Sequence, residues 1–132
     1  MKQITESYVS YEIAKLLKEK GFDEYCGTAY TTAEGYPIRV MGSTYSLERN
    51  SDYDNLHYSM PSQSLALKWL REVHKLFVKV NYTTHPITKD KNYYGSVINM
   101  EDVRETVLAF EDALTYEGCV NSLLKYALEK LI

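Results

Sequence analysis

The segment of residues 60–77 constrains the fold more than any other, because it has the pattern of an amphipathic helix that packs on a core. Its apolar residues recur at spacings of three and four, as one face of a helix requires: Leu65, Ala66, Trp69, Leu70, Val73 and Phe77. Pro61 suits the first helical turn, where its missing N–H removes no intrahelical hydrogen bond. We therefore expect a helix that ends near Leu76 and buries Trp69, the only tryptophan of the chain.

Two further helices are predicted near the ends of the sequence. Ser10 can cap a helix over residues 11–20, and Gly21 follows as a stop signal. Thr115 can cap a final helix that runs to the C-terminus. Its apolar stripe consists of Val120, Leu123, Leu124, Ala127, Leu128 and Leu131.

Strand patterns occupy much of the remaining sequence. Residues 26–32 and 36–41 flank a turn and predict a hairpin, while residues 77–82 and 93–100 alternate apolar and polar side chains. Residues 106–110 are assigned to another strand, with a helix as the alternative. Residues 42–59 show no period and predict a long loop or an irregular edge strand.

The predicted order of elements is αββαβββα, which indicates an α+β fold. We expect an antiparallel sheet of about four to five strands, with three helices mainly on one face. A chain of 132 residues with 45% hydrophobic content is long enough for one core, so residues 1–132 are expected to form a single domain.

Charge and cysteine content narrow the class of protein. The 15 Lys and Arg residues against 18 Asp and Glu residues give a net charge of −3, so nucleic acid is not an expected partner. Two lone cysteines, Cys26 and Cys119, fit a reducing cytoplasm better than a disulfide-stabilised exterior. The sequence lacks an apolar run long enough for a membrane span, so we expect a cytoplasmic protein with no membrane partner.

Three stretches carry a resemblance to a known group of sequences. They are PSQ at residues 61–63, KWLRE at residues 68–72 followed by His74, and KYALEKLI at residues 125–132. With these stretches the chain resembles a family of short hypothetical proteins from Bacteroides, their phages and mobile elements. The resemblance implies no activity and no catalytic residue, because the matching residues are mostly packing and capping residues.

Tyrosine is unusually frequent, with 13 residues against 3 Phe and 1 Trp. Most of these tyrosines fall in or beside predicted strands, where an apolar ring with a polar tip suits a half-exposed sheet face. Residues 44–58 combine aromatic rings, a guanidinium, amides and carboxylates, which is typical of recognition loops and also of solvent loops. The candidate ligand- or partner-binding residues are Arg39, Tyr45, Arg49, Tyr53, His57 and Tyr58.

No catalytic, metal or cofactor site is predicted. His57, His74 and His85 could form a metal set with Asp52 or Asp54, but their spacing matches no known ligand pattern. The glycines are scattered and form no phosphate-binding loop.

We expect a non-enzymatic accessory protein, made by a phage or mobile element, that binds a protein or a small molecule. One alternative is an anti-defence protein that sequesters a signalling nucleotide, with Arg39, Arg49 or Lys79 on the phosphates. A second alternative is a small hydrolytic enzyme, whose acid and base groups would come from Asp52, Asp54, His57 and His74. A third alternative is a homo-oligomer.

Overall fold

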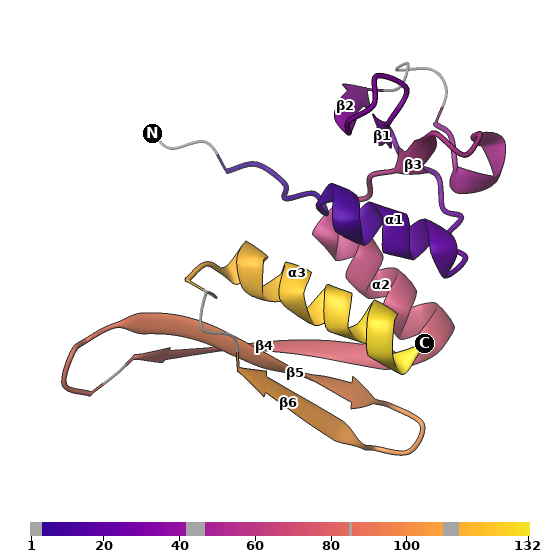
Figure 1. The fold of residues 1–132 in the computed structure, drawn as a ribbon. Coiled ribbons are helices and arrows are strands. Elements are labelled where there is room, and N and C mark those ends of the chain that lie inside the picture. The colour runs from indigo at the N-terminus through magenta and orange to yellow at the C-terminus, as the bar shows by residue number, and fades with distance from the viewer. Residues whose placement is uncertain (1–3, 42–46, 85, 110–113) are drawn as a thin grey trace. The chain divides into compact units, whose positions relative to one another are not determined.

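The computed structural model in Figure 1 describes residues 4–41, 47–84, 86–109 and 114–132. These residues form three α-helices and two antiparallel three-stranded sheets, which confirms the predicted α+β class. The chain divides into two compact units, Met1–Ala66 and Leu67–Ile132, each with one sheet. None of the helices in the described ranges has the length and the apolar content that crossing a membrane requires.

Helix α1 (Tyr11–Glu19) belongs to the N-terminal unit and begins where the sequence predicts. The Ser10 hydroxyl accepts a hydrogen bond from the backbone N–H of Ile13 (3.4 Å), which satisfies one free donor of the first turn. Gly21 follows with a left-handed backbone (φ 92°), a conformation that glycine adopts without strain. The buried side chains of α1 are Ile13, Ala14 and Leu17.

The sheet of the N-terminal unit has the order β2-β1-β3. Its central strand β1 (Thr28–Thr31) pairs with β2 (Ile38–Met41) as the predicted hairpin, and on its other side with β3 (His57–Ser59). The register aligns Tyr58, Tyr30 and Arg39 in one row across the sheet.

Tyrosines of this row pack against α1. The Tyr11 ring lies 5.7 Å from the Tyr30 ring and 5.5 Å from the Tyr58 ring, measured between centroids. The Tyr30 hydroxyl donates a hydrogen bond to the carbonyl of Val9 (2.9 Å). These tyrosines therefore combine apolar packing with a satisfied polar tip.

The structure differs from the predicted single sheet in strand number and order. Residues 57–59 form β3 in a stretch where we expected a loop or an irregular edge strand, which gives the order αβββαβββα. Strand β3 lies at the edge of its sheet, so residues 57–59 agree with the second of these alternatives, although a strand of three residues is too short to show an alternating pattern. Each sheet forms from strands of its own unit.

Helix α2 (Gln63–His74) contains the boundary between the two units. It begins after Ser62, whose hydroxyl accepts a hydrogen bond from Leu65 N (3.1 Å). Trp69 is 6% exposed, as predicted for a core residue.

At the end of α2, the predicted apolar face includes two residues that the structure does not bury. Val73 is 55% exposed and Phe77 is 39% exposed, although both were expected in the core. For Phe77 the reason is Lys75, whose backbone φ of 56° turns the chain out of the helix. Phe77 therefore belongs to the next strand, where Leu76 is the buried residue.

The sheet of the C-terminal unit has the order β4-β5-β6. The strands are β4 (Leu76–Thr84), β5 (Lys91–Asn99) and β6 (Glu105–Ala109), and all pairs are antiparallel. For residues 106–110 the sequence allowed either a strand or a helix. The residues of this stretch that the structure describes form a strand, β6.

Helix α3 (Tyr116–Tyr126) lies along one face of this sheet and contacts β4 and β5 (Figure 1). Thr115 caps it as predicted, since its hydroxyl accepts a hydrogen bond from Gly118 N (3.0 Å). The helix approaches the sheet closely at Gly95. A Cβ atom there would lie 2.6 Å from Leu123 Cδ1, and closer still to the carbonyl oxygen of Lys79.

The last turn of the chain is a π-helix, η2 (Ala127–Leu131). Five members of the predicted stripe are fully buried: Val120, Leu123, Leu124, Ala127 and Leu128. Leu131, the sixth, is 38% exposed.

Candidate functional site

The loop of residues 47–59 in the N-terminal unit is held by side-chain hydrogen bonds. Asn50, at the start of the short helix η1 (Asn50–Asp52), is 6% exposed. Its side-chain amide donates to the carbonyl of Phe22 (2.8 Å) and accepts from the backbone N–H of Ser59 (2.9 Å). One buried side chain thus joins the loop to the segment after α1 and to β3.

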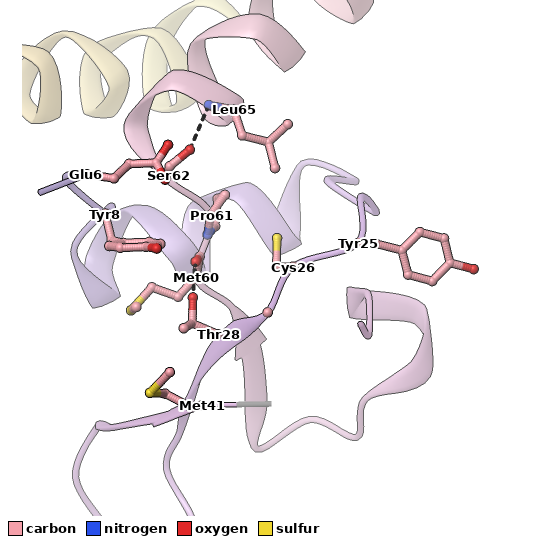
Figure 2. A pocket seen from close by; sticks show the side chains of 11 residues that line it. Glu6, Tyr8, Tyr25, Cys26, Thr28, Met41, Met60, Pro61, Ser62 and Leu65 are labelled. Atoms are coloured by element: carbon pink, nitrogen blue, oxygen red, sulfur yellow. Dashed lines mark hydrogen bonds between the residues drawn. The ribbon is translucent and has the colours of Figure 1, made fainter. Parts of the chain in front are cut away.

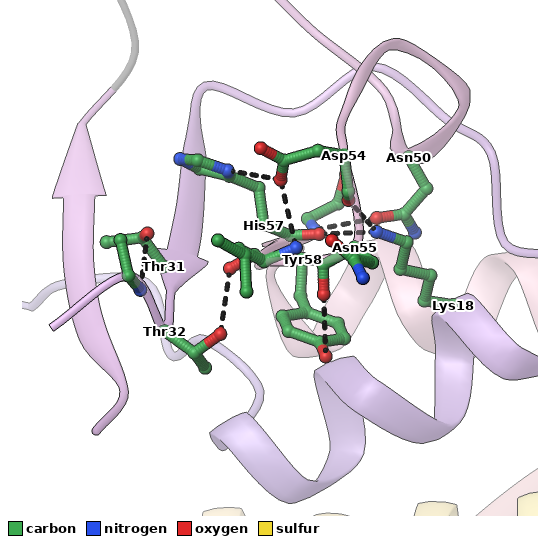
Figure 3. A network of polar contacts seen from close by, with 11 residues as sticks. Lys18, Thr31, Thr32, Asn50, Asp54, Asn55, His57 and Tyr58 are labelled. Atoms are coloured by element: carbon green, nitrogen blue, oxygen red, sulfur yellow. Dashed lines mark hydrogen bonds and ion pairs between the residues drawn. The ribbon is translucent and has the colours of Figure 1, made fainter. Parts of the chain in front are cut away.

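Lys18 of α1 makes a second anchor (Figure 3). Its ammonium Nζ donates to the carbonyls of Asp54 and His57, at 2.6 Å each, and lies 4.8 Å from the centroid of the Tyr58 ring. Burial lowers the pKa of Lys18, and the nearby carboxylate of Asp54 partly opposes that shift. The Lys18 ammonium thereby ties helix α1 to two backbone carbonyls of the loop.

Asp54 and His57 form a hydrogen-bonded pair on the loop. The Asp54 Oδ1 atom lies 2.7 Å from His57 Nδ1 and also accepts from the backbone N–H of Leu56 (2.9 Å). The hydrogen bond from His57 is the main reason why the pKa of Asp54 is lowered. Thr32 fixes the same turn, since its backbone N–H and its hydroxyl both donate to the carbonyl of Leu56.

Two aromatic contacts complete the loop surface. The Tyr53 ring stacks on His57 with centroids 5.7 Å apart and planes at 27°. The Arg49 guanidinium lies 4.9 Å from the centroid of the Tyr25 ring, and its Nε is 3.9 Å from Asp52 Oδ2. Burial raises the pKa of Tyr53, and the charges of nearby Glu48 and Asp52 raise it further.

The predicted binding residues therefore separate into groups. Tyr53 and His57 come together, with Arg49 on the same loop. Tyr58 packs on Tyr11 and donates its hydroxyl to the carbonyl of Asn55 (3.2 Å).

The other two predicted residues lie elsewhere or are not described. Arg39 on β2 lies over the ring of Tyr8, 5.7 Å from its centroid. Tyr45 lies outside the residues that the structure describes.

Sequence reasoning missed Lys18 and Asn50, the two residues that organise the loop. A lysine in the last turn of a helix is usual, because it interacts favourably with the helix dipole. An asparagine in a polar loop is equally ordinary. Neither position carries a signal that points to partners 28 to 39 residues away in the sequence.

The Asp54–His57 pair could orient an imidazole for acid–base chemistry. Both side chains are substantially exposed to solvent, and within the described ranges no Ser, Thr or Cys side chain donates a hydrogen bond to the His57 ring. Asp52 accepts from the backbone N–H of Arg49 (3.1 Å), which is a capping role. His74 lies in the C-terminal unit, where its ring meets Trp69 edge-on at 4.7 Å between centroids.

Metal binding receives no support from the part of the chain that is described. There, no group of three or more His, Cys, Asp or Glu side chains could hold a metal ion. His85, one member of the imagined set, lies outside the described residues.

A cavity of about 330 Å³ lies in the same unit, beside β1 and the start of α2 (Figure 2). Its polar groups are largely engaged: Thr28 Oγ1 donates to the carbonyl of Met60 (2.8 Å), and Ser62 caps α2. Cys26 borders it, but burial raises the pKa of this thiol to about 11, so it is a poor nucleophile. The apolar part of the lining comes from Tyr8, Met41, Met60, Pro61 and Leu65.

No protein-family model, no curated protein and no solved structure matches this chain.

Proposed function

We propose that this chain is a non-enzymatic binding protein that recognises another protein through the loop of residues 47–59. The observation that carries the proposal is the set of internal hydrogen bonds that Asn50 and Lys18 donate and that Asp54 accepts. A loop fixed in this way loses little conformational entropy when it binds. Its accessible rings and guanidinium, from Tyr53, His57 and Arg49, are residue types that anchor protein interfaces.

The charge of the loop favours a protein partner over a nucleotide. Residues 47–59 contain three carboxylates, Glu48, Asp52 and Asp54, against the one guanidinium of Arg49. The Lys18 ammonium already binds backbone carbonyls. Phosphates would be repelled by this surface, whereas neutral or basic side chains of a protein would complement it.

The wider role follows from the sequence resemblance. We propose that the protein acts in a bacterial cytoplasm as an accessory factor of a phage or mobile element. The nucleotide-sequestering alternative, with Arg39, Arg49 or Lys79 on the phosphates, stays a second proposal, and Arg39 and Arg49 contact different tyrosines, Tyr8 and Tyr25.

The test compares two double variants. In Arg49→Ala with Tyr53→Ala, binding should be lost, while the free energy of unfolding falls by only about 1–2 kcal/mol because both side chains are partly exposed. Tyr36→Ala with Lys15→Ala removes a tyrosine and a cationic side chain at exposed positions of the same unit and is the matched control.

The readout is affinity capture from host lysate, quantified by mass spectrometry for each variant. Support requires a protein enriched by the wild type and the control but not by the loop variant. A partner retained equally by the loop variant would contradict the proposal. So would a thermal shift from a nucleotide that the loop variant abolishes, which would favour nucleotide sequestration.

A further inference from the structure

A second cavity, of about 260 Å³, lies in the C-terminal unit. Leu76 and Val97 form its apolar floor on strands β4 and β5, and both are almost fully buried. Leu131 of the π-helix contributes an exposed apolar wall. The exposed apolar surface of the cavity therefore comes from Leu131, above a floor of buried side chains.

Polar groups line the same cavity on the sheet side. Asn99 at the end of β5 and Thr106 on β6 provide an amide and a hydroxyl. Two cations from different segments complete the lining, Arg104 from the β5–β6 turn and Lys130 from η2. Four of the seven lining residues are polar, which suits a ligand that has a charged head and a short apolar part.

Arg104 is held in position before any ligand arrives. Its carbonyl accepts a hydrogen bond from Asn99 N (2.8 Å), and its Nε and Nη2 donate to Asp102 Oδ2 at 2.8 and 2.6 Å. The guanidinium still has N–H donors beyond these two, and its side chain is exposed.

Backbone strain and irregular helix geometry coincide at this cavity. Val103, just before Arg104, has a φ of 61°, which is costly for a β-branched residue. Lys130 and Leu131 belong to a π-helix, a feature that occurs frequently at functional sites. Arg104 thus follows a residue with a left-handed backbone, and Lys130 and Leu131 lie in a π-helix. Both conformations are uncommon in regular secondary structure.

We propose that this cavity binds a small monocarboxylate, with Arg104 and Lys130 holding the carboxylate and the apolar tail resting on Leu76, Val97 and Leu131. A guanidinium suits a carboxylate because it donates parallel hydrogen bonds to the two oxygens. The volume corresponds to about eight water molecules, so the ligand is a short-chain acid. This site does not depend on the proposed function of the loop in the N-terminal unit.

The test titrates the full chain with hexanoate while amide resonances are followed by NMR. We expect shifts at Val97, Asn99, Thr106 and Leu131, with a dissociation constant of about a millimolar. Hexanol has the same tail without the charge and should bind at least about tenfold more weakly.

Charge variants identify the residues responsible. Arg104→Gln with Lys130→Gln should weaken hexanoate binding at least about tenfold. Lys15→Gln with Lys91→Gln removes the same charge at two exposed positions outside the cavity and should bind like the wild type. A melting temperature for each variant verifies that it is folded.

Four results would overturn this site. The first three are an absence of shifts in the wild type, equal binding of hexanol and hexanoate, and equal hexanoate affinity in the Arg104/Lys130 double variant. Inorganic phosphate that binds as tightly as hexanoate would also overturn it, because the apolar floor would then contribute nothing.

Discussion

At the scale of single residues, buried polar groups with matched partners organise the N-terminal unit. Asn50 satisfies one backbone carbonyl and one backbone N–H at the same time, from Phe22 and Ser59. An apolar residue in its place would leave both groups buried without a partner, and such groups cost more than the hydrogen bonds themselves contribute. The rigidity of the proposed binding loop therefore depends on this side chain.

Asn50→Ala tests this dependence. We expect the free energy of unfolding to fall by about 2–4 kcal/mol, because two buried backbone groups lose their partners. Asn55→Ala, at an exposed position of the same loop, should change it by less than about 0.5 kcal/mol. Urea denaturation of both variants measures the difference, and equal effects would mean that the Asn50 contacts are not stabilising.

The burial of His74 makes the stability of the fold depend on pH. Its Nε2 is buried, and among the described residues no atom forms a hydrogen bond with it. Burial lowers the pKa of His74 below its ordinary value of 6.5. The folded state therefore binds this proton less readily than the unfolded chain does.

The sign of the pH dependence follows from that shift. The stability linked to His74 is complete above the unfolded pKa of 6.5, and it falls as the pH drops through 6.5 toward the lower folded pKa. His74→Phe keeps a ring beside Trp69 and removes the titration. Urea denaturation between about pH 5 and pH 8 should show a smaller loss in the variant than in the wild type. An unchanged loss would assign the pH dependence to other groups.

At the scale of elements, the close approach of α3 to its sheet depends on one small residue. Gly95 on β5 lies where a Cβ atom would overlap the backbone of β4 and the side chain of Leu123. Backbone atoms of a paired strand cannot move aside without breaking the ladder. The contact of α3 with the sheet therefore requires glycine at this position.

Gly95→Ala should lower the free energy of unfolding by about 2–3 kcal/mol, through overpacking between strand and helix. Gly27→Ala is the control, since a Cβ there would meet only Leu47 Cδ2 at an ordinary 3.6 Å. Thermal or chemical denaturation distinguishes the two. A Gly95 variant as stable as the Gly27 variant would show that α3 can shift without cost.

At the scale of the whole chain, local sequence signals predicted the three helices, the caps at Ser10 and Thr115, and the strands other than β3. Ser10 and Thr115 accept the predicted capping hydrogen bonds, and Trp69 is buried on the predicted face. These features follow from contacts between residues three and four apart, or from alternation, and such local rules can be read from sequence.

Tertiary structure alone decided the division into two sheets, the pairing of residues 57–59 with β1 and the candidate sites. Lys18 reaches carbonyls 36 and 39 residues away, and Asn50 reaches 28 residues back to Phe22. The cavity with Arg104 and Lys130 likewise joins a turn to a helix end. Such partners are chosen by the geometry of the folded backbone, and neither the type nor the spacing of these residues records that geometry.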